Sequence, residues 1–371
     1  MKRGLAILLI FLSTEVLAGV PAGPAHPVPV VKHVTVNQLE QILKASHGDS
    51  DRKVSPELGD LQLSERLAGK QLLQLRAELP GGNSRRALEL LADESAFLEP
   101  PAEEIPVREE PDFAAQQRMM AQTVDYLARI LPQLPNFFAT RTTSRFLENR
   151  PLASNLSQDD LSYMRLQRAG SVSGTVLYRD GKEVVDTGKR KRMPYNPSAQ
   201  MLTTRGVFGP ILSLIIVDAA KSKFTWSHWE QDTSGLRAVY QFEVPKEKSH
   251  YQVEFCCFAG LATAAGFFQK YSSYHGEVAV DPVNGTILRL TAIADMELGD
   301  PILESDISVE YAPVEIGGRN YFCPVKSVSL WVASMPERHV LETLLNSSVF
   351  TEYHQFRSES RILIDGAPAT P

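Results

Sequence analysis

The sequence predicts an α+β fold in which a large antiparallel β-sheet, curved into a half-open barrel with a helical lid, follows a small all-helical segment. Leucines recur at helical spacing before residue 98, and Pro and Glu then interrupt the chain. After Pro135 the apolar residues alternate with a period of two. About ten consecutive strand patterns with hairpin-length gaps indicate one large sheet, curved or partly closed.

The composition is that of an ordinary globular protein, with 43% hydrophobic and 22% charged residues among 371. The chain carries 38 Lys and Arg against 44 Asp and Glu, which gives a formal net charge of -6. A nucleic-acid-binding surface needs a surplus of basic residues gathered on one face, so we expect no nucleic-acid partner. The 3 cysteines are too few for a disulfide scaffold.

The N-terminal residues have the pattern of a secretory signal peptide. Lys2 and Arg3 precede a short apolar run, and the small residue Ala18 marks the expected cleavage point. We therefore expect residues 1–18 to be removed and the mature protein to be periplasmic or extracellular. An uncleaved anchor is the alternative, but the apolar run is shorter than the about 20 residues that span a membrane.

Three segments precede the sheet. Residues 19–33 are rich in Pro, Ala, Gly and Val and are predicted to form an extended tether. Residues 34–98 are predicted to be the helical segment, because leucine stripes on short helices must pack together to be stable. Residues 99–112 are rich in Pro and Glu and are predicted to be a linker, since proline removes donors and the carboxylates repel one another.

The β-rich domain is predicted over residues 113–364, and residues 365–371 are predicted to be a disordered tail. The domain opens with the strongest amphipathic helix of the chain, at residues 113–131, followed by a long strand rich in Thr. Asp180 and Gly181 predict a type I′ hairpin turn, because both residue types tolerate a positive φ.

No catalytic signature is present in the sequence. It lacks His-Glu-x-x-His, a phosphate-binding glycine loop, Gly-x-Ser-x-Gly and Cys-x-x-Cys, and its 8 histidines are scattered. We therefore predict no enzyme activity, no metal and no cofactor. On a regular strand His228 shares a face with Trp226, while Trp229 points to the other side. A packing role for His228 at a sheet rim is weighed against contact with a ligand at a cavity mouth.

Cysteines and a basic run each allow two interpretations. Cys256 and Cys257 point to opposite faces of a strand, so at most one can pair with Cys323, and buried free thiols are the preferred alternative. The basic run serves either as a peripheral contact with anionic membrane lipids or as a solvated strand edge. It comprises Lys189, Arg190, Lys191 and Arg192.

Residues 276–290 have the pattern of a hairpin, with Val280-Asp281-Pro282 at the end of the first strand, Gly285 in the turn and Arg289-Leu290 in the second strand. This pattern resembles a hairpin of the lipoprotein-carrier-like family, which includes the periplasmic proteins that sort lipoproteins to the bacterial outer membrane. An amphipathic helix leading into a Thr-rich strand follows the same order of elements. The resemblance implies that residues 113–364 wrap a hydrophobic cavity closed by helices and either carry acyl chains or sense envelope components. The helical segment departs from the carriers, and no functional residue of theirs matches a position here.

Over most of its length the chain is also similar to a group of uncharacterised exported bacterial proteins of the acidobacterial type. The stretches that carry this closer likeness are residues 63–67, 96–101 and 134–141. This second likeness implies no known activity.

We therefore expect a non-enzymatic binding protein of the cell envelope that holds a lipid, an acyl chain or another hydrophobic ligand. A curved sheet too large to be filled by its own side chains leaves a cavity. An internal helix at residues 209–220 is expected to be the lid, and aromatic strand residues the walls. The candidate ligand-binding residues are Phe208, Ile211, Leu214, Ile215, Trp226, Phe242 and Phe255. The alternative is an envelope structural or interaction protein whose helical segment docks a protein partner.

Overall fold

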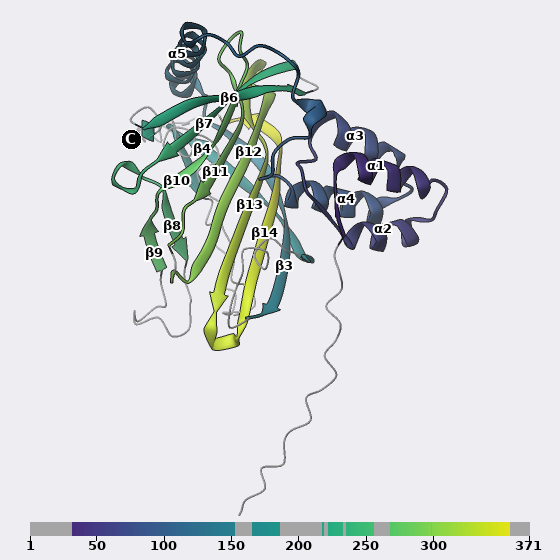
Figure 1. Ribbon diagram of the computed structural model, residues 1–371. Helices are drawn as coiled ribbons and strands as arrows, with labels where there is room; N and C mark the ends of the chain where they lie inside the picture. The colour runs from purple at the N-terminus through teal and green to yellow at the C-terminus, as the bar shows by residue number, and fades with distance from the viewer. Residues whose placement is uncertain are drawn as a thin grey trace, which may run out of the picture. The chain divides into compact units, whose positions relative to one another are not determined.

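A 10-stranded antiparallel sheet dominates the structure, which is a computed structural model of the chain (Figure 1). The described residues belong to the compact unit Val31–Pro371. They are residues 32–152, 165–185, 217–218, 222–232, 235–255, 268–297 and 299–356.

The strands of the sheet lie in the order β5-β4-β3-β14-β13-β12-β11-β10-β7-β6, and the sheet is not closed into a barrel. A small antiparallel pair, β8 with β9, lies outside this sheet. The bounds are β3 (Phe137–Pro151), β4 (Gln167–Arg179), β5 (Lys182–Val185), β6 (Lys223–Asp232), β7 (Gly235–Val244), β8 (Gln252–Phe255), β9 (Phe268–Tyr271), β10 (Tyr274–Val280), β11 (Ile287–Ala294), β12 (Ile302–Ile316), β13 (Arg319–Met335) and β14 (Val340–Gln355).

The predicted α+β class and the large antiparallel sheet are confirmed. The predicted turn between β4 and β5 has φ values of 51° at Asp180 and 78° at Gly181, as a type I′ turn requires. The sequence pattern predicts the last strand over residues 350–359, but the strand begins ten residues earlier, at Val340. Leu344 and Leu345 contact apolar clusters on opposite faces there, so the period-two signal is lost.

The helical segment has a hydrophobic core of its own. Thr35 and Gln38 form a capping box that begins the first helix. Leu39, Leu58 and Leu88 come from three different helices and are all at most 1% exposed, so the leucine stripes meet. The elements are β1 (Lys32–Val34), α1 (Val36–Ala45), α2 (Asp51–Gly59), β2 (Leu61–Leu63), α3 (Gly69–Glu78) and α4 (Gly82–Glu94).

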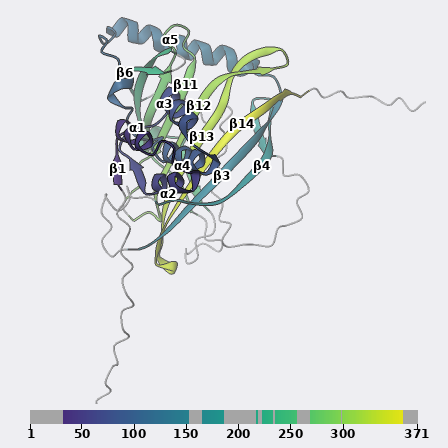
Figure 2. The same ribbon diagram turned by 90° about the vertical axis from the view of Figure 1, so that its right-hand side faces the viewer.

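Helix α5 (Phe113–Ile130) lies across one end of the sheet (Figures 1 and 2). Its Met119 and Leu127 belong to the main core cluster together with strand residues. The turn before β11 approaches the helix closely: Gly285 has φ +74°, and a Cβ there would lie 2.5 Å from the backbone carbonyl carbon of Gln122. The hairpin at residues 276–290, which resembles that of the lipoprotein carriers, therefore packs directly on α5.

The two faces of the sheet differ in chemistry. The face that packs with α5, which we call the α5 face, carries buried aliphatic residues such as Val278, Leu290 and Val309. The opposite face, which we call the segment face, contacts the helical segment and carries Arg289 and Lys326 instead. Both faces carry apolar clusters, but buried charged residues lie mainly on the segment face.

Candidate functional site

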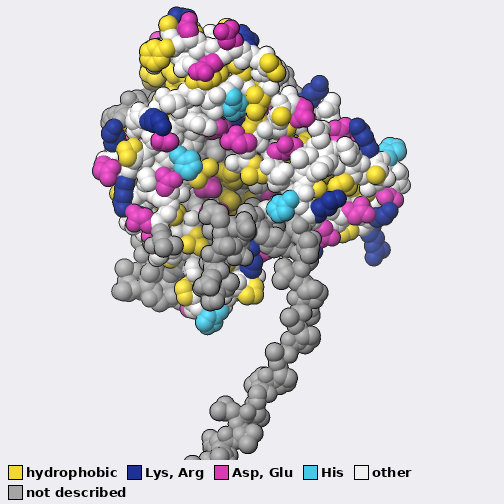
Figure 3. All heavy atoms as spheres, in the orientation of Figure 1, with side chains coloured by type: hydrophobic (Ala, Val, Ile, Leu, Met, Phe, Trp, Pro, Cys, Tyr) yellow, Lys and Arg dark blue, Asp and Glu magenta, His cyan; other side chains and the backbone are white. Residues whose placement is uncertain are grey.

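An apolar groove lies between α5 and the edge hairpin β6–β7. It has a volume of about 540 Å³. Figure 3 shows hydrophobic side chains gathered on the surface around α5, at the top of the view. Among the groove residues the only charged side chain is that of Asp125. The lining residues are Phe113, Gln116, Gln117, Met120, Ala121, Val124, Asp125, Ser222, Phe224, Trp226 and Tyr240.

The strand wall of the groove is a packed aromatic cluster. The ring of Trp226 meets Tyr240 edge-on at 5.4 Å and Trp229 at 4.8 Å. Phe224 packs on Tyr240 with ring centroids 5.4 Å apart. The hydroxyl of Tyr240 donates to the carbonyl of Gln116 at 3.3 Å, which joins this wall to α5. Such aromatic pairs are worth about 0.5–1.5 kcal/mol beyond their buried area, so the wall is well fixed.

The linker before α5 closes over the far side of this cluster. The indole Nε1 of Trp229 donates to the carbonyl of Glu109 at 2.9 Å. The guanidinium of Arg108 lies 4.8 Å from the centre of the Trp229 ring, in cation–π geometry. These contacts hold Trp229 in place behind Trp226.

The predicted separation of Trp226 and Trp229 onto opposite faces is wrong, because β6 contains a β-bulge. Trp226 pairs with Tyr240 and His228 pairs with Val239, so Ser227 is an extra residue in the strand. The bulge brings both tryptophans to the α5 face and turns His228 to the segment face. There the Nδ1 of His228 lies 2.9 Å from Ser227 Oγ, and its Nε2 lies 3.9 Å from Glu230 Oε2.

Of the predicted ligand-binding residues, Trp226 lines the groove. Phe242 is 1% exposed and packs on Phe224 and Tyr274 in the core. Cys323 is a buried free thiol. The side chain of Phe255 lies outside the described residues, as do Phe208, Ile211, Leu214, Ile215, Cys256, Cys257, Lys189, Arg190, Lys191 and Arg192.

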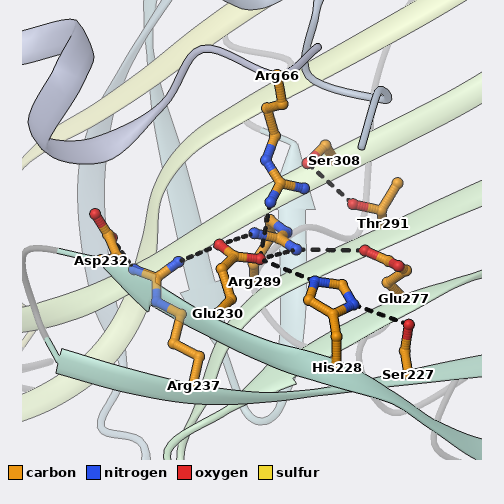
Figure 4. A network of polar contacts seen from close by, with 10 residues as sticks. All are labelled: Arg66, Ser227, His228, Glu230, Asp232, Arg237, Glu277, Arg289, Thr291 and Ser308. Atoms are coloured by element: carbon orange, nitrogen blue, oxygen red, sulfur yellow. Dashed lines mark hydrogen bonds and ion pairs between the residues drawn. The ribbon is translucent and has the colours of Figure 1, made fainter. Parts of the chain in front are cut away.

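On the segment face, directly behind the groove, a buried ionic network centres on Glu230 (Figure 4). Arg289 donates from Nη1 to Glu230 Oε1 at 2.7 Å and from Nη2 to Oε2 at 2.9 Å. Arg66, on the loop between β2 and α3, donates to Oε2 at 2.8 Å. Burial alone raises the pKa of Glu230, but Arg289, Arg66 and Arg237 bring that pKa down to about 2. Glu230 therefore stays ionised and links β6 to β11 and to the helical segment.

Other charges extend this network. Arg237 pairs with Asp232, and Arg289 also donates to Glu277 Oε2 at 3.3 Å. The carboxylate of Asp232 lies against Gly69 at the start of α3, where the helix dipole favours an anion. Burial raises the pKa of Glu104 to about 7, and repulsion by Glu230 adds to that rise.

A second cavity, of about 490 Å³, lies beside Arg66 between α3 and the segment face. Its lining cations already have carboxylate partners: Arg66 and Arg289 bind Glu230, and Lys326 binds Asp93 at 2.6 Å. The cavity thus offers no surplus charge, and its network acts as a structural joint.

The imidazole of His250 and the buried carboxylate of Asp218 form a pair with the geometry that catalytic sites use. Asp218 is fully buried and accepts from His250 Nδ1 at 2.6 Å and from the hydroxyl of Tyr274 at 3.0 Å. Within the part of the chain that the structure describes, no Ser, Thr or Cys side chain hydrogen-bonds to the His250 ring. The pair therefore has no activated nucleophile among those residues.

No protein-family model, curated protein or solved structure matches this chain. Across the described ranges, no helix combines the length and apolar character needed to cross a membrane. Within the same ranges, no group of three or more His, Cys, Asp or Glu residues is arranged to hold a metal ion.

The α5 half of the groove was missed from sequence. Phe113, Met120 and Val124 lie on the predicted helix, where an apolar residue is normally assigned to the core. Phe113 is 74% exposed and Val124 is 45% exposed. The available signal was that α5 carries more apolar residues than one buried stripe needs.

Proposed function

We propose that this protein is an exported, non-enzymatic binding protein of the cell envelope that holds an acyl chain or a similar hydrophobic ligand. The ligand site is the groove between α5 and β6–β7. The observation that carries this proposal is the apolar lining of that groove, in which Trp226 and Phe224 face Met120 and Val124 of the helix. The helical lid of the carrier is then α5.

The size and chemistry of the groove suit one apolar chain. Its volume of about 540 Å³ lies within the range of small-molecule sites, which is about 300–1,000 Å³. Its lining includes neither Lys nor Arg. Each apolar Å² that a ligand covers contributes about 25 cal/mol, so a bound chain gains affinity mainly through burial.

The exposed apolar side chains at the edge of the groove favour a bound hydrophobic ligand over contact with water. Phe113 and Val124 leave large apolar side chains in water, and contiguous apolar surface on a soluble protein often marks a binding site. The opposite wall is rigid, because the Glu230 network ties β6 to its neighbours from behind. A groove between the fixed hairpin β6–β7 and the helix α5 suits a site that takes up and releases acyl chains.

Two features of the sequence support the same assignment. Residues 1–18 have the signal-peptide pattern, which is the basis for proposing export. The hairpin at residues 276–290 resembles that of the lipoprotein carriers, and its Gly285 packs against α5.

The alternative, a helical segment that docks a protein partner, is less favoured. That segment already uses Asp93 to bind Lys326 and Arg66 to bind Glu230. Its Leu90 and Phe97 also pack on the cluster that includes Leu330. These side chains are therefore engaged within the chain.

The test is a binding titration of the mature protein with a neutral acyl probe whose fluorescence reports polarity. We expect Val124→Glu to weaken probe binding about tenfold, or about 1.4 kcal/mol, because it places a charge in the groove. Leu73→Glu is the matched control, since Leu73 is a 61% exposed aliphatic residue on α3. Equal probe affinity in the wild-type protein and the Val124→Glu variant would overturn the assignment of this groove.

Extraction of the protein from its own host gives an independent readout. Lipid mass spectrometry should find a stoichiometric hydrophobic ligand in the wild-type protein and less of it in the Val124→Glu variant. A lipid-free extract with a stoichiometric protein partner would favour the alternative function.

A further inference from the structure

Arg145 lies in the middle of β3 on the α5 face of the sheet. Phe137 and Ala139, on the same side of this strand, are fully buried in the main core cluster. The next residue, Phe146, packs on the opposite face with Leu345. Because side chains alternate along a strand, Arg145 shares the α5 face with Ala139.

The cross-strand neighbours of Arg145 are small and polar. Arg145 pairs with Asn346 of β14, which pairs with Ser329 of β13. Two residues before Arg145 in β3, Thr143 pairs with Ser348, and their hydroxyl oxygens are 2.8 Å apart. We call this set the polar patch: Thr143, Arg145, Ser327, Ser329, Asn346 and Ser348.

The polar patch lies between two apolar clusters on this face. Phe350 of the main core lies on one side of it along β14, and Leu344 of a second apolar cluster lies on the other. Asn346 and Ser348 are nevertheless only 6% and 5% exposed. Buried polar side chains need hydrogen-bonding partners, and Thr143 and Ser348 provide one for each other.

Arg145 is the only positive charge in the polar patch, and it forms no ion pair or hydrogen bond with any residue that the structure describes. Its Nε is buried and lacks an acceptor. Burial lowers the pKa of Arg145, and the nearby charge of Arg141 lowers it further. By contrast, Arg66 and Arg289 on the segment face both bind Glu230.

A partly buried guanidinium without a counter-charge is less favourable than one that is paired with an anion. Arg presents a planar fork of donors that matches carboxylate and phosphate groups, and Ser, Thr and Asn add neutral donors. The polar patch thus has the donors for an oxyanion, while its own residues supply no carboxylate.

We propose that the polar patch binds the oxyanion of a ligand, a carboxylate or a phosphate group, with Arg145 as its main contact. This site goes beyond the proposed groove, which lies on β6 and β7 at one end of the strand order, whereas Arg145 is on β3 near the other. The oxyanion comes either from the headgroup of an amphiphile or from free phosphate.

The test compares three probes on the full mature protein by isothermal titration calorimetry at low salt: inorganic phosphate, dodecyl phosphate and dodecanol. We expect the anionic probe that binds to lose at least about tenfold in affinity in Arg145→Gln, as removal of a charged hydrogen-bonding pair predicts. Arg145→Lys should bind with intermediate affinity, because a point charge replaces the fork. Arg319→Gln, at an exposed position of β13, is the matched control and should bind normally.

The three probes distinguish a headgroup from free phosphate as the source of the oxyanion. They also distinguish failure of the polar patch from failure of the proposed groove. Binding of both phosphates supports free phosphate as ligand, and binding of dodecyl phosphate alone supports a headgroup. Absence of binding by either anion in the wild-type protein, or equal binding in folded Arg145→Gln, overturns the oxyanion site. Dodecanol reports on the groove separately, because its neutral headgroup has no need of Arg145.

Discussion

The two faces of the sheet are covered in different ways. On the α5 face, a helix packs through Met119 and Leu127 into a continuous apolar cluster. On the segment face, the helical segment is held by two buried ion pairs, Arg66 with Glu230 and Asp93 with Lys326, besides a smaller apolar cluster. Apolar packing is non-directional, whereas a buried ion pair is favourable in only one arrangement. The segment face therefore fixes position, and the α5 face supplies most of the hydrophobic stabilisation.

The largest expected loss of stability comes from removing the charge of Glu230, at the centre of the ionic network on the segment face. Glu230→Gln removes the charge that Arg289 and Arg66 share and leaves both guanidinium groups buried without it. Breaking a buried pair in this way costs about 3–5 kcal/mol. Urea unfolding should show this loss, while Glu243→Gln, in an exposed pair with Lys223, should change stability by less than about 1 kcal/mol. Equal stability of the two variants would contradict the role assigned to Glu230 in holding the network together.

Removing an apolar contact tests the other face. Leu127→Ala opens a cavity between α5 and the sheet and should lower the free energy of unfolding by about 3 kcal/mol. Val124→Ala serves as control, since that side chain is 45% exposed and little buried area is lost. The loss in Leu127→Ala should be nearly independent of salt. A strong salt dependence would mean that α5 is held by charges as well.

The second ion pair separates anchoring from overall stability. Lys326→Met leaves Asp93 buried without its partner and should loosen the helical segment, because Asp93 is 4% exposed. Adding Asp93→Leu should recover part of the loss, with a coupling energy of about 0.5–3 kcal/mol in a double-mutant cycle. Hydrogen exchange in α4 should report this change. Additive effects of the two substitutions would contradict direct coupling.

The smallest effect concerns pH. Burial raises the pKa of Glu104 to about 7, well above its value in an unfolded chain. A raised acid pKa favours the folded state fully at low pH, and that contribution is lost as pH rises from about 4.5 through 7. Glu104→Gln should therefore flatten the fall in thermal stability over this range. Identical pH profiles in both proteins would show that Glu104 titrates normally.

Local sequence patterns predicted the helices, the antiparallel sheet and the Asp180-Gly181 turn, because each depends on residues close in the chain. The ion pairs could not be found this way, since Arg66 and Glu230 are 164 residues apart. The bulge at Ser227 was equally hidden, because a period-two pattern assumes a regular strand. The face on which Arg145 lies could be predicted from its position in the Thr-rich strand. Its polar surroundings could not, because they depend on the register between β3, β14 and β13.

The bulge in β6 also defines where this strand tolerates a change of length. Deleting a residue from a regular strand sends every following side chain to the opposite face. Ser227 is the exception, because Trp226 already pairs with Tyr240 and His228 with Val239, the adjacent residue. Loss of Ser227 would leave a regular strand with Trp229 still on the α5 face and Glu230 still directed towards its arginines. A protein descended from the same ancestor can therefore lack this residue and keep both faces of the strand unchanged.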